Sequence, residues 1–145
     1  MAGDTDSRSG YSTFEHTADV GLEVRGTSLT DLFEQAAAGF IDLMFDTRTI
    51  RPVRTVPIAV LAEEPEELLV AWLEEILFAF DANGFAAAEA RVASLGGGEV
   101  KGHLAGEDFD PRRHEVRLAV KAVTYHNLAI RKVGESYEVK IVFDV

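Results

Sequence analysis

Apolar and polar residues alternate in short runs near both ends of the chain, which is the pattern of half-buried strands. Residues 11–26 contain one such run at Val20, Leu22 and Val24, after a polar corner at residues 15–19. The closing run has an apolar face formed by Tyr137, Val139, Ile141 and Phe143 and a polar face formed by Glu138, Lys140 and Asp144. We therefore expect an opening pair of strands, and a final strand that follows a turn at residues 134–136.

Two longer segments repeat apolar residues at helical spacing. The first follows Ser28, an N-cap candidate with Asp31 three residues on as a variant capping box. The second follows the acidic run at residues 63–67, which resembles a metal site but also suits a helix start, where proline and carboxylates are favoured. We favour the helix start. Both helices are predicted to be buried through Leu32, Phe33, Ala36, Ala37, Phe40, Ile41 and Met44, and through Leu68, Leu69, Trp72, Leu73, Ile76, Leu77 and Phe80.

The remaining segments predict further strands: residues 51–62, an edge strand because it carries two prolines; a hairpin of residues 86–95 and 99–106; and residues 115–125. The predicted fold class is α+β. We expect a two-layer domain in which a mixed or antiparallel sheet, flat or curled toward a barrel, carries two helices on one face. Strand, helix and strand recur in each half, which suggests an old internal duplication, although no sequence repeat proves it.

With 145 residues, the chain is expected to form one domain over residues 11–145, preceded by a disordered polar tail at residues 1–10. It contains no cysteine, so disulfides and thiolate metal sites are excluded, which fits a cytoplasmic location. No secretory signal core and no apolar run of about 18 residues is found, so we expect no membrane association.

The formal net charge of -11 opposes direct binding of RNA or DNA, because nucleic-acid affinity depends on neutralising phosphates with Lys and Arg. Basic residues do cluster at residues 48–54 and 112–117, where a local basic patch could form. The overall charge favours a protein partner or a cation.

Candidate chemistry is sparse. His16 and Asp19 lie three residues apart in the polar corner, a weak signal that a structural turn also explains. Lys121 and His126 add polar groups around an apolar segment. A zinc site built from His16, His103, His114 and His126 is conceivable, but their irregular spacing across different elements favours an oxygen-ligand site for a hard cation.

The last two residues, Asp144 and Val145, bring two anions close together if Val145 carries the terminal carboxylate. These anions repel each other unless water, a basic group or a cation separates them. The pattern alone leaves open whether this is a metal site or a strand that ends at the surface.

Three stretches, HTADVG at residues 16–21, VKAVTYH at residues 120–126 and IVFDV at residues 141–145, together resemble the archease family. The resemblance extends over nearly the whole chain and includes residues 68–81 and a Gly-Glu turn at residues 106–107. It implies a small acidic accessory protein that assists an RtcB-type tRNA-splicing RNA ligase by promoting guanylylation of the ligase with GTP and its multiple turnover. On this view the protein is not itself an enzyme, and it meets RNA only indirectly, through the ligase.

The resemblance also implies a divalent metal site formed by Asp19, Asp144 and Val145, with His16, Lys121 and His126 as candidates for supporting roles. The metal would be calcium by resemblance, with magnesium and manganese as alternatives. For this site, Asp19 has to lie beside the closing strand. Two other functions stay open: a small metal-dependent hydrolase or phosphoesterase that uses Asp19 and Asp144, and a general chaperone-like binder.

Overall fold

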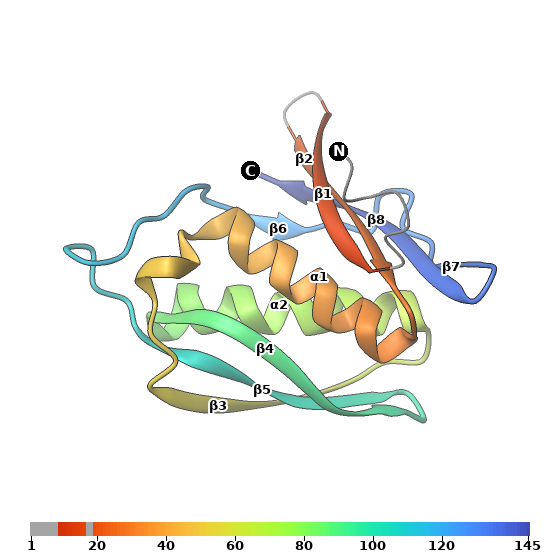
Figure 1. The fold of residues 1–145 in the computed structure, drawn as a ribbon, viewed down its shortest axis with the longest axis horizontal. Coiled ribbons are helices and arrows are strands. Elements are labelled where there is room, and N and C mark those ends of the chain that lie inside the picture. The colour runs from red at the N-terminus through yellow and green to blue at the C-terminus, as the bar shows by residue number, and fades with distance from the viewer. Residues whose placement is uncertain (1–8, 17–18) are drawn as a thin grey trace.

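Two antiparallel sheets enclose two helices in the computed structural model, which describes residues 9–16 and 19–145 (Figure 1). The five-stranded sheet contains β1 (Gly10–His16), β2 (Asp19–Gly26), β6 (Ala122–Val123), β7 (Arg131–Val133) and β8 (Ser136–Asp144). The three-stranded sheet contains β3 (Arg54–Leu61), β4 (Phe85–Gly96) and β5 (Glu99–Asp108). The helices are α1 (Leu29–Met44) and α2 (Pro65–Asn83), with a short 3-10 turn, η2, at Thr47–Thr49.

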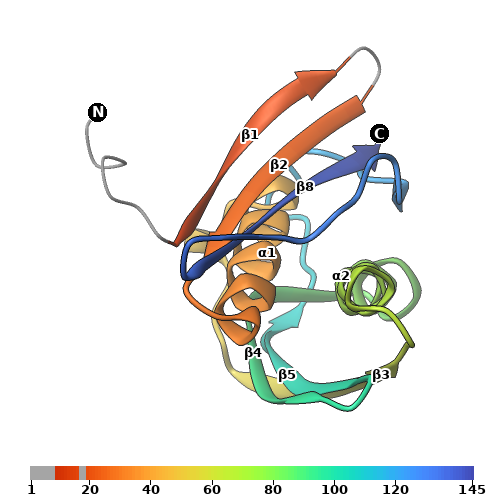
Figure 2. The ribbon, with the colours of Figure 1, turned by 90° about the vertical axis from the view of Figure 1, so that its right-hand side faces the viewer.

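The predicted α+β class is confirmed, but the strands divide between two sheets where one was expected. Their orders are β1-β2-β8-β6, with β7 also paired to β8, and β3-β5-β4. Figure 2 shows α1 and α2 between the sheets, and neither sheet closes into a barrel. The proposed internal duplication stays a prediction.

Both helix starts follow the capping chemistry expected from the sequence. Ser28 caps α1 by accepting a hydrogen bond from the Asp31 backbone N–H at 3.0 Å, and the Asp31 carboxylate accepts one from the Thr27 N–H at 2.8 Å. In α2, Glu64 and Glu67 form a reciprocal capping box, and Pro65 occupies the first turn. The acidic run at residues 63–67 is therefore a helix start, as predicted.

The core lies on both sides of α1. Phe40 of α1 stacks on Phe143 of β8, with ring centroids 4.8 Å apart. On the other side, the fully buried Trp72 of α2 donates its indole N–H to the Phe33 carbonyl at 3.0 Å. Each helix thus contributes apolar residues to an interior bounded by two sheets, which explains why both helices carry broad apolar faces.

The predicted strand at residues 115–125 is wrong over most of its length. Only Ala122–Val123 forms a strand, β6, while Val116 makes an isolated bridge to Phe45. The backbone N–H of Arg117 donates to the Met44 carbonyl at 2.7 Å, so this segment satisfies the end of α1 instead of a neighbouring strand. It crosses from the three-stranded sheet to the five-stranded sheet, a route that its local pattern could not reveal.

The other strand predictions are confirmed. β3 is an edge strand, and β4 and β5 form the expected hairpin around Gly97 and Gly98, both of which have positive φ. Val139, Ile141 and Phe143 of β8 are buried as predicted, and Val142 on the other face is also buried.

The predicted tail falls mostly on residues 1–8, outside the described residues. None of the helices within residues 9–16 and 19–145 is long and apolar enough to span a bilayer.

Candidate metal centre

Asp19 and Asp144 lie directly opposite each other where β2 pairs with β8. The neighbouring pair, Val20 and Phe143, faces the core, and Phe143 is fully buried. Because successive side chains of a strand point to opposite faces, both aspartates lie on the outer face of the sheet. Asp19 is partly exposed and Asp144 is exposed, so both carboxylates can be reached from solvent.

The glycine of the HTADVG stretch has a packing role beside these carboxylates. Gly21 pairs with Phe14 of β1, and a Cβ atom at Gly21 would lie only 2.0 Å from the Phe14 ring. Val142 is opposite Gly21 in β8 and is buried on this outer face. Glycine at position 21 therefore lets the Phe14 ring lie against the sheet next to the aspartate pair.

Hydrogen bonds from the residues that flank β6 hold the end of β8 in place. The Asp144 carbonyl accepts a hydrogen bond from the Lys121 N–H at 2.7 Å. The Val142 carbonyl accepts two bonds from Thr124, from the backbone N–H at 3.0 Å and the hydroxyl at 2.8 Å. Val145 is partly buried and packs its side chain against the core. These contacts hold the end of β8 against β6 and the core.

This arrangement suits a hard divalent cation. Two like charges directly opposite each other destabilise a strand pair, whereas a cation between them turns the repulsion into attraction. Calcium and magnesium prefer oxygen ligands, and two carboxylates with a main-chain oxygen form such a donor set. Among the residues that the structure describes, no group of three His, Cys, Asp or Glu side chains could hold a metal.

The three residues expected to support the site differ in position. His16 pairs with Asp19 in the β1–β2 register, and its side chain is outside the described part of the structure. Lys121 immediately precedes β6 and is exposed, and its backbone N–H bonds to the Asp144 carbonyl. His126 is exposed in the turn that follows β6.

The histidines do not converge on a zinc site among the described residues. His103 lies on β5 in the three-stranded sheet, and His114 is buried in the link after β5. His126 belongs to the segment after β6, which joins the other sheet. The zinc alternative therefore has no geometric support from these three residues.

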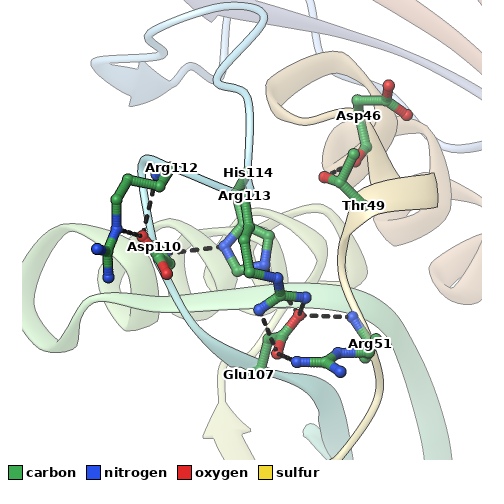
Figure 3. Close-up of polar contacts among 8 residues, drawn as sticks. All are labelled: Asp46, Thr49, Arg51, Glu107, Asp110, Arg112, Arg113 and His114. Carbon is green, nitrogen blue, oxygen red and sulfur yellow. Dashed lines mark hydrogen bonds and ion pairs between the residues drawn. The ribbon is translucent and has the colours of Figure 1, made fainter.

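Sequence reasoning missed a buried polar cluster around Glu107 (Figure 3). Its carboxylate lies 2.8 Å from His114 Nε2 and accepts hydrogen bonds from the Arg113 side chain and from the Arg51 N–H. The Asp110 N–H donates to His114 Nδ1 at 2.8 Å, so Nδ1 is unprotonated and Nε2–H donates to Glu107. The side-chain bond to Arg113 and the backbone bond from Arg51 hold the pKa of Glu107 well below its usual range. The sequence predicts Glu107 only as part of a Gly-Glu turn, whereas the structure places it within β5.

The predicted basic patch also proves to be internally paired. The Arg48 side chain forms two bonds to the carboxylate of Asp46. These bonds, with the Arg48 backbone N–H and the charges of Arg48 and Arg117, outweigh the opposing effect of burial and lower the pKa of Asp46 to about 2. The other arginines of residues 48–54 and 112–117 pair with Asp42, Asp46, Glu107, Asp108 and Asp110. Asp46 joins Arg48 to Arg117 and Glu107 joins Arg51 to Arg113, so two carboxylates bridge the two basic stretches. Every arginine of these stretches has an acidic partner.

Comparisons with known proteins agree with this fold. Residues 11–145 match the model of the archease protein family. Protein archease of Sulfolobus acidocaldarius is 35% identical over 136 residues, which cover 93% of this chain and 98% of that protein. Protein archease of Thermococcus gammatolerans is 37% identical over 128 residues, which cover 86% of this chain and 90% of that protein.

Two solved structures have the same architecture. The solution structure of protein 1598 of Methanobacterium thermoautotrophicum superposes with a TM-score of 0.79 at 27% identity, covering 94% of this chain and 99% of that one. The crystal structure of an archease from Thermotoga maritima, described as a possible chaperone, gives a TM-score of 0.67 at 26% identity and covers 91% of this chain and 94% of that one. The match spans nearly the full length in sequence and in structure, and the chain belongs to the archease family.

Proposed function

We propose that this protein is a non-enzymatic activator of an RtcB-type tRNA-splicing RNA ligase, and that it requires a divalent metal held by Asp19, Asp144 and Val145. It promotes guanylylation of the ligase with GTP and repeated turnover during RNA joining. Membership of the archease family supports the class of function. The direct opposition of Asp19 and Asp144 is the single observation that supports the metal requirement.

The residues of this chain would act by holding and presenting the cation. Asp19 and Asp144 supply one carboxylate each from adjacent strands, and Val145 supplies a main-chain oxygen. When bound, a divalent cation supplies positive charge that can engage phosphate or carboxylate oxygens of a partner. Because the pair lies on the outer face of the sheet, its unfilled coordination positions would point toward an approaching protein and not into the core.

The chain offers poor support for catalysis of its own. Its triple-glycine stretch joins β4 to β5, so it is a hairpin turn and not a phosphate-binding loop before a helix. Among the histidines whose burial the structure describes, His114 is the most buried, and both of its ring nitrogens are in hydrogen bonds. These observations favour activation of another enzyme over the hydrolase alternative.

A time course of ligase guanylylation tests the proposal. An RtcB-type ligase from the same organism is incubated with GTP and a divalent metal, with and without this protein. We expect faster guanylylation and more than one RNA joined per ligase molecule when the protein is present. An unchanged time course, or phosphoester turnover by the purified protein alone, would refute the proposed function.

A further inference from the structure

A hollow of about 300 Å³ lies where the starts of both helices meet the tip of the β4–β5 hairpin. Two of its lining residues, Phe33 of α1 and Leu68 of α2, are buried. Half-buried apolar side chains complete the lining, namely Leu29, Ala62 and Leu95. In Figure 1 the starts of α1 and α2 and the turn between β4 and β5 lie at the same, right-hand end of the molecule. Segments far apart in the chain thus build one apolar depression.

A more open hollow of about 470 Å³ adjoins this first one. The two hollows share four residues, Ala62, Glu63, Gly97 and Gly98. The second also includes Leu61, the last residue of β3, whose side chain is 74% exposed. We call the two hollows together the hairpin groove. Contiguous exposed apolar surface of this kind marks a site of contact with another protein, because leaving it in water is unfavourable.

The wall of the hairpin groove at the hairpin tip is held by a main-chain contact. The Ala62 N–H donates to the Gly98 carbonyl at 2.9 Å, which ties the residue after β3 to the tip. Gly98 has a φ of 77°, and a Cβ atom there would lie only 2.8 Å from the Ala62 carbonyl oxygen. Glycine therefore lets β3 approach the hairpin closely, and it leaves this side of the groove free of side chains.

The charged side chains of the hairpin groove are acidic. Glu63 lines both hollows, and Glu64 lines the first. Among the described residues that line the groove there is no lysine, arginine or histidine. Ser28 and the capping box of Glu64 and Glu67 already cap the two helix starts, so an anion would compete there with the chain's own oxygens. The groove therefore favours a cation beside the apolar group that fills it.

We propose that the hairpin groove binds a segment of a protein partner in which a side chain of leucine or phenylalanine size adjoins a lysine or arginine. The apolar side chain fills the hollow at Phe33 and Leu68, and the neighbouring part of the segment covers Leu61. The cationic side chain pairs with Glu63. Removal of apolar surface from water supplies most of the affinity, and the ion pair at the exposed rim selects for positive charge.

Other occupants fit the hairpin groove less well. A nucleic acid would bring its phosphates to Glu63 and Glu64. A second copy of the chain would bring a net charge of -11 against an equal charge. A small molecule would be covered on one side only, because the first hollow continues into the more open one, whereas small-molecule sites bury most of their ligand.

The hairpin groove lies at the opposite end of β2 from the aspartate pair. β2 begins at Asp19 and ends at Gly26, and the groove begins two residues later, at Ser28. The 8 residues of this strand span about 26 Å. A partner segment of a few residues in the groove therefore leaves the aspartate pair accessible. The inference does not rest on the proposed function.

A titration with short blocked peptides tests the chemistry of the occupant. A chelator is present, and the amide signals of Leu61, Ala62, Gly97 and Gly98 of the full-length protein are followed by NMR. We expect a peptide with phenylalanine between two lysines to shift these signals. Replacing its phenylalanine by serine, or both lysines by glutamate, should weaken binding about fivefold or more. No shift with the first peptide, or equal binding of either control peptide, would overturn the inference.

Two exposed residues of the groove can be changed without altering the core. Leu61→Gln and Glu63→Lys should each weaken binding of the phenylalanine–lysine peptide about threefold or more. Phe78→Gln matches the first change at a side chain of α2 that is 58% exposed, and Glu115→Lys matches the second at an exposed position outside the groove. Both controls should bind like the wild type. Wild-type affinity in either groove variant, or an equal loss in its control, would contradict binding in the groove.

Sedimentation equilibrium at the protein concentration of the titration tests the remaining occupant. We expect both the wild type and Leu61→Gln to be monomers. A wild-type dimer that Leu61→Gln converts to a monomer would show that a second copy fills the groove, and the inference would be wrong. None of these measurements uses a metal or the RNA ligase, so failure of the proposed function would leave their results unchanged.

Discussion

Asp19 of β2 and Asp144 of β8 face each other as a directly opposed pair on the outer face of the five-stranded sheet. Like charges in this position repel each other, and a cation held between them would lower that repulsion. The pair lies where the chain also holds Val145 against the core. A bound divalent metal should therefore stabilise the folded protein, and this stabilisation should require both aspartates.

Replacing either aspartate should separate the repulsion between the two carboxylates from the stabilisation by a bound metal. Without metal, Asp19→Asn and Asp144→Asn should change the free energy of unfolding by about 1 kcal/mol or less, because both side chains reach solvent and asparagine keeps their shape. Calcium or magnesium at about 100 times Kd should stabilise the wild type by about 2.7 kcal/mol. Thermal melts with added metal or with a chelator measure both effects. A metal-dependent rise of the same size in both variants would exclude this site.

Trp72→Ala should reduce the free energy of unfolding by about 3–5 kcal/mol. The ring is fully buried between the helices and the three-stranded sheet, and its N–H is bonded to the Phe33 carbonyl. Trp72→Phe keeps part of the volume but loses this bond, so its effect should be smaller. Urea denaturation of the three proteins checks the order. A loss near zero for Trp72→Ala would contradict the described core.

Gly102 and Gly96 provide a matched pair of glycines in the β4–β5 hairpin. A Cβ atom at Gly102 would lie 2.0 Å from the Arg91 carbonyl oxygen, a backbone atom that cannot rotate away, whereas one at Gly96 meets nothing within 4 Å. Gly102→Ala should therefore lower the melting temperature clearly, and Gly96→Ala should change it little. Equal melting temperatures would show that β4 and β5 are not in this register.

The Glu107 cluster should make stability depend on pH in the acidic range. The carboxylate is bonded to the Arg113 side chain and to the Arg51 N–H, which lowers the folded-state pKa of Glu107 below its ordinary value of 4.5. A lowered carboxylate pKa stabilises the folded protein above the unfolded-state pKa, and this contribution is lost as pH falls toward the folded-state value. The pKa of Asp46 is about 2, so its contribution to stability is lost as pH falls from its ordinary value of 3.8 to about 2.

The melting temperature should therefore fall as pH decreases from about 5 to 2. Glu107→Gln should melt lower than the wild type at neutral pH and should show a smaller fall on acidification, because it has no carboxylate to protonate. Glu63→Gln, at an exposed position outside the cluster, serves as the control. If the wild type and Glu107→Gln have parallel pH profiles, Glu107 is not a source of the acid sensitivity.

The sequence predicted those elements whose signals are local. The starts of α1 and α2 could be found because Ser28 and the acidic run carry their own capping chemistry, and β8 could be found from its alternation. The position of Asp19 beside the closing strand followed from the family resemblance, and the register confirms it. The metal itself stays a prediction.

The features that could not be predicted depend on contacts between distant residues. Nothing in the local pattern of residues 115–121 shows that the Arg117 N–H binds the end of α1, so the segment was assigned to a strand. The Glu107 cluster joins residues 56 apart in the chain, and no periodicity reports such a pair. The division into two sheets likewise depends on which strands pair, which alternation does not encode.

Guanylylation of the cognate ligase in the presence of Asp144→Asn protein tests the central claim most directly. The measurement compares initial rates with GTP and calcium for the ligase alone, with wild-type protein, with Asp144→Asn and with Asp19→Asn. We predict that the wild type accelerates guanylylation, that chelation of the metal removes the acceleration, and that both folded variants leave the ligase at its unassisted rate. Acceleration by both variants equal to that of the wild type would contradict a working metal centre at Asp19 and Asp144.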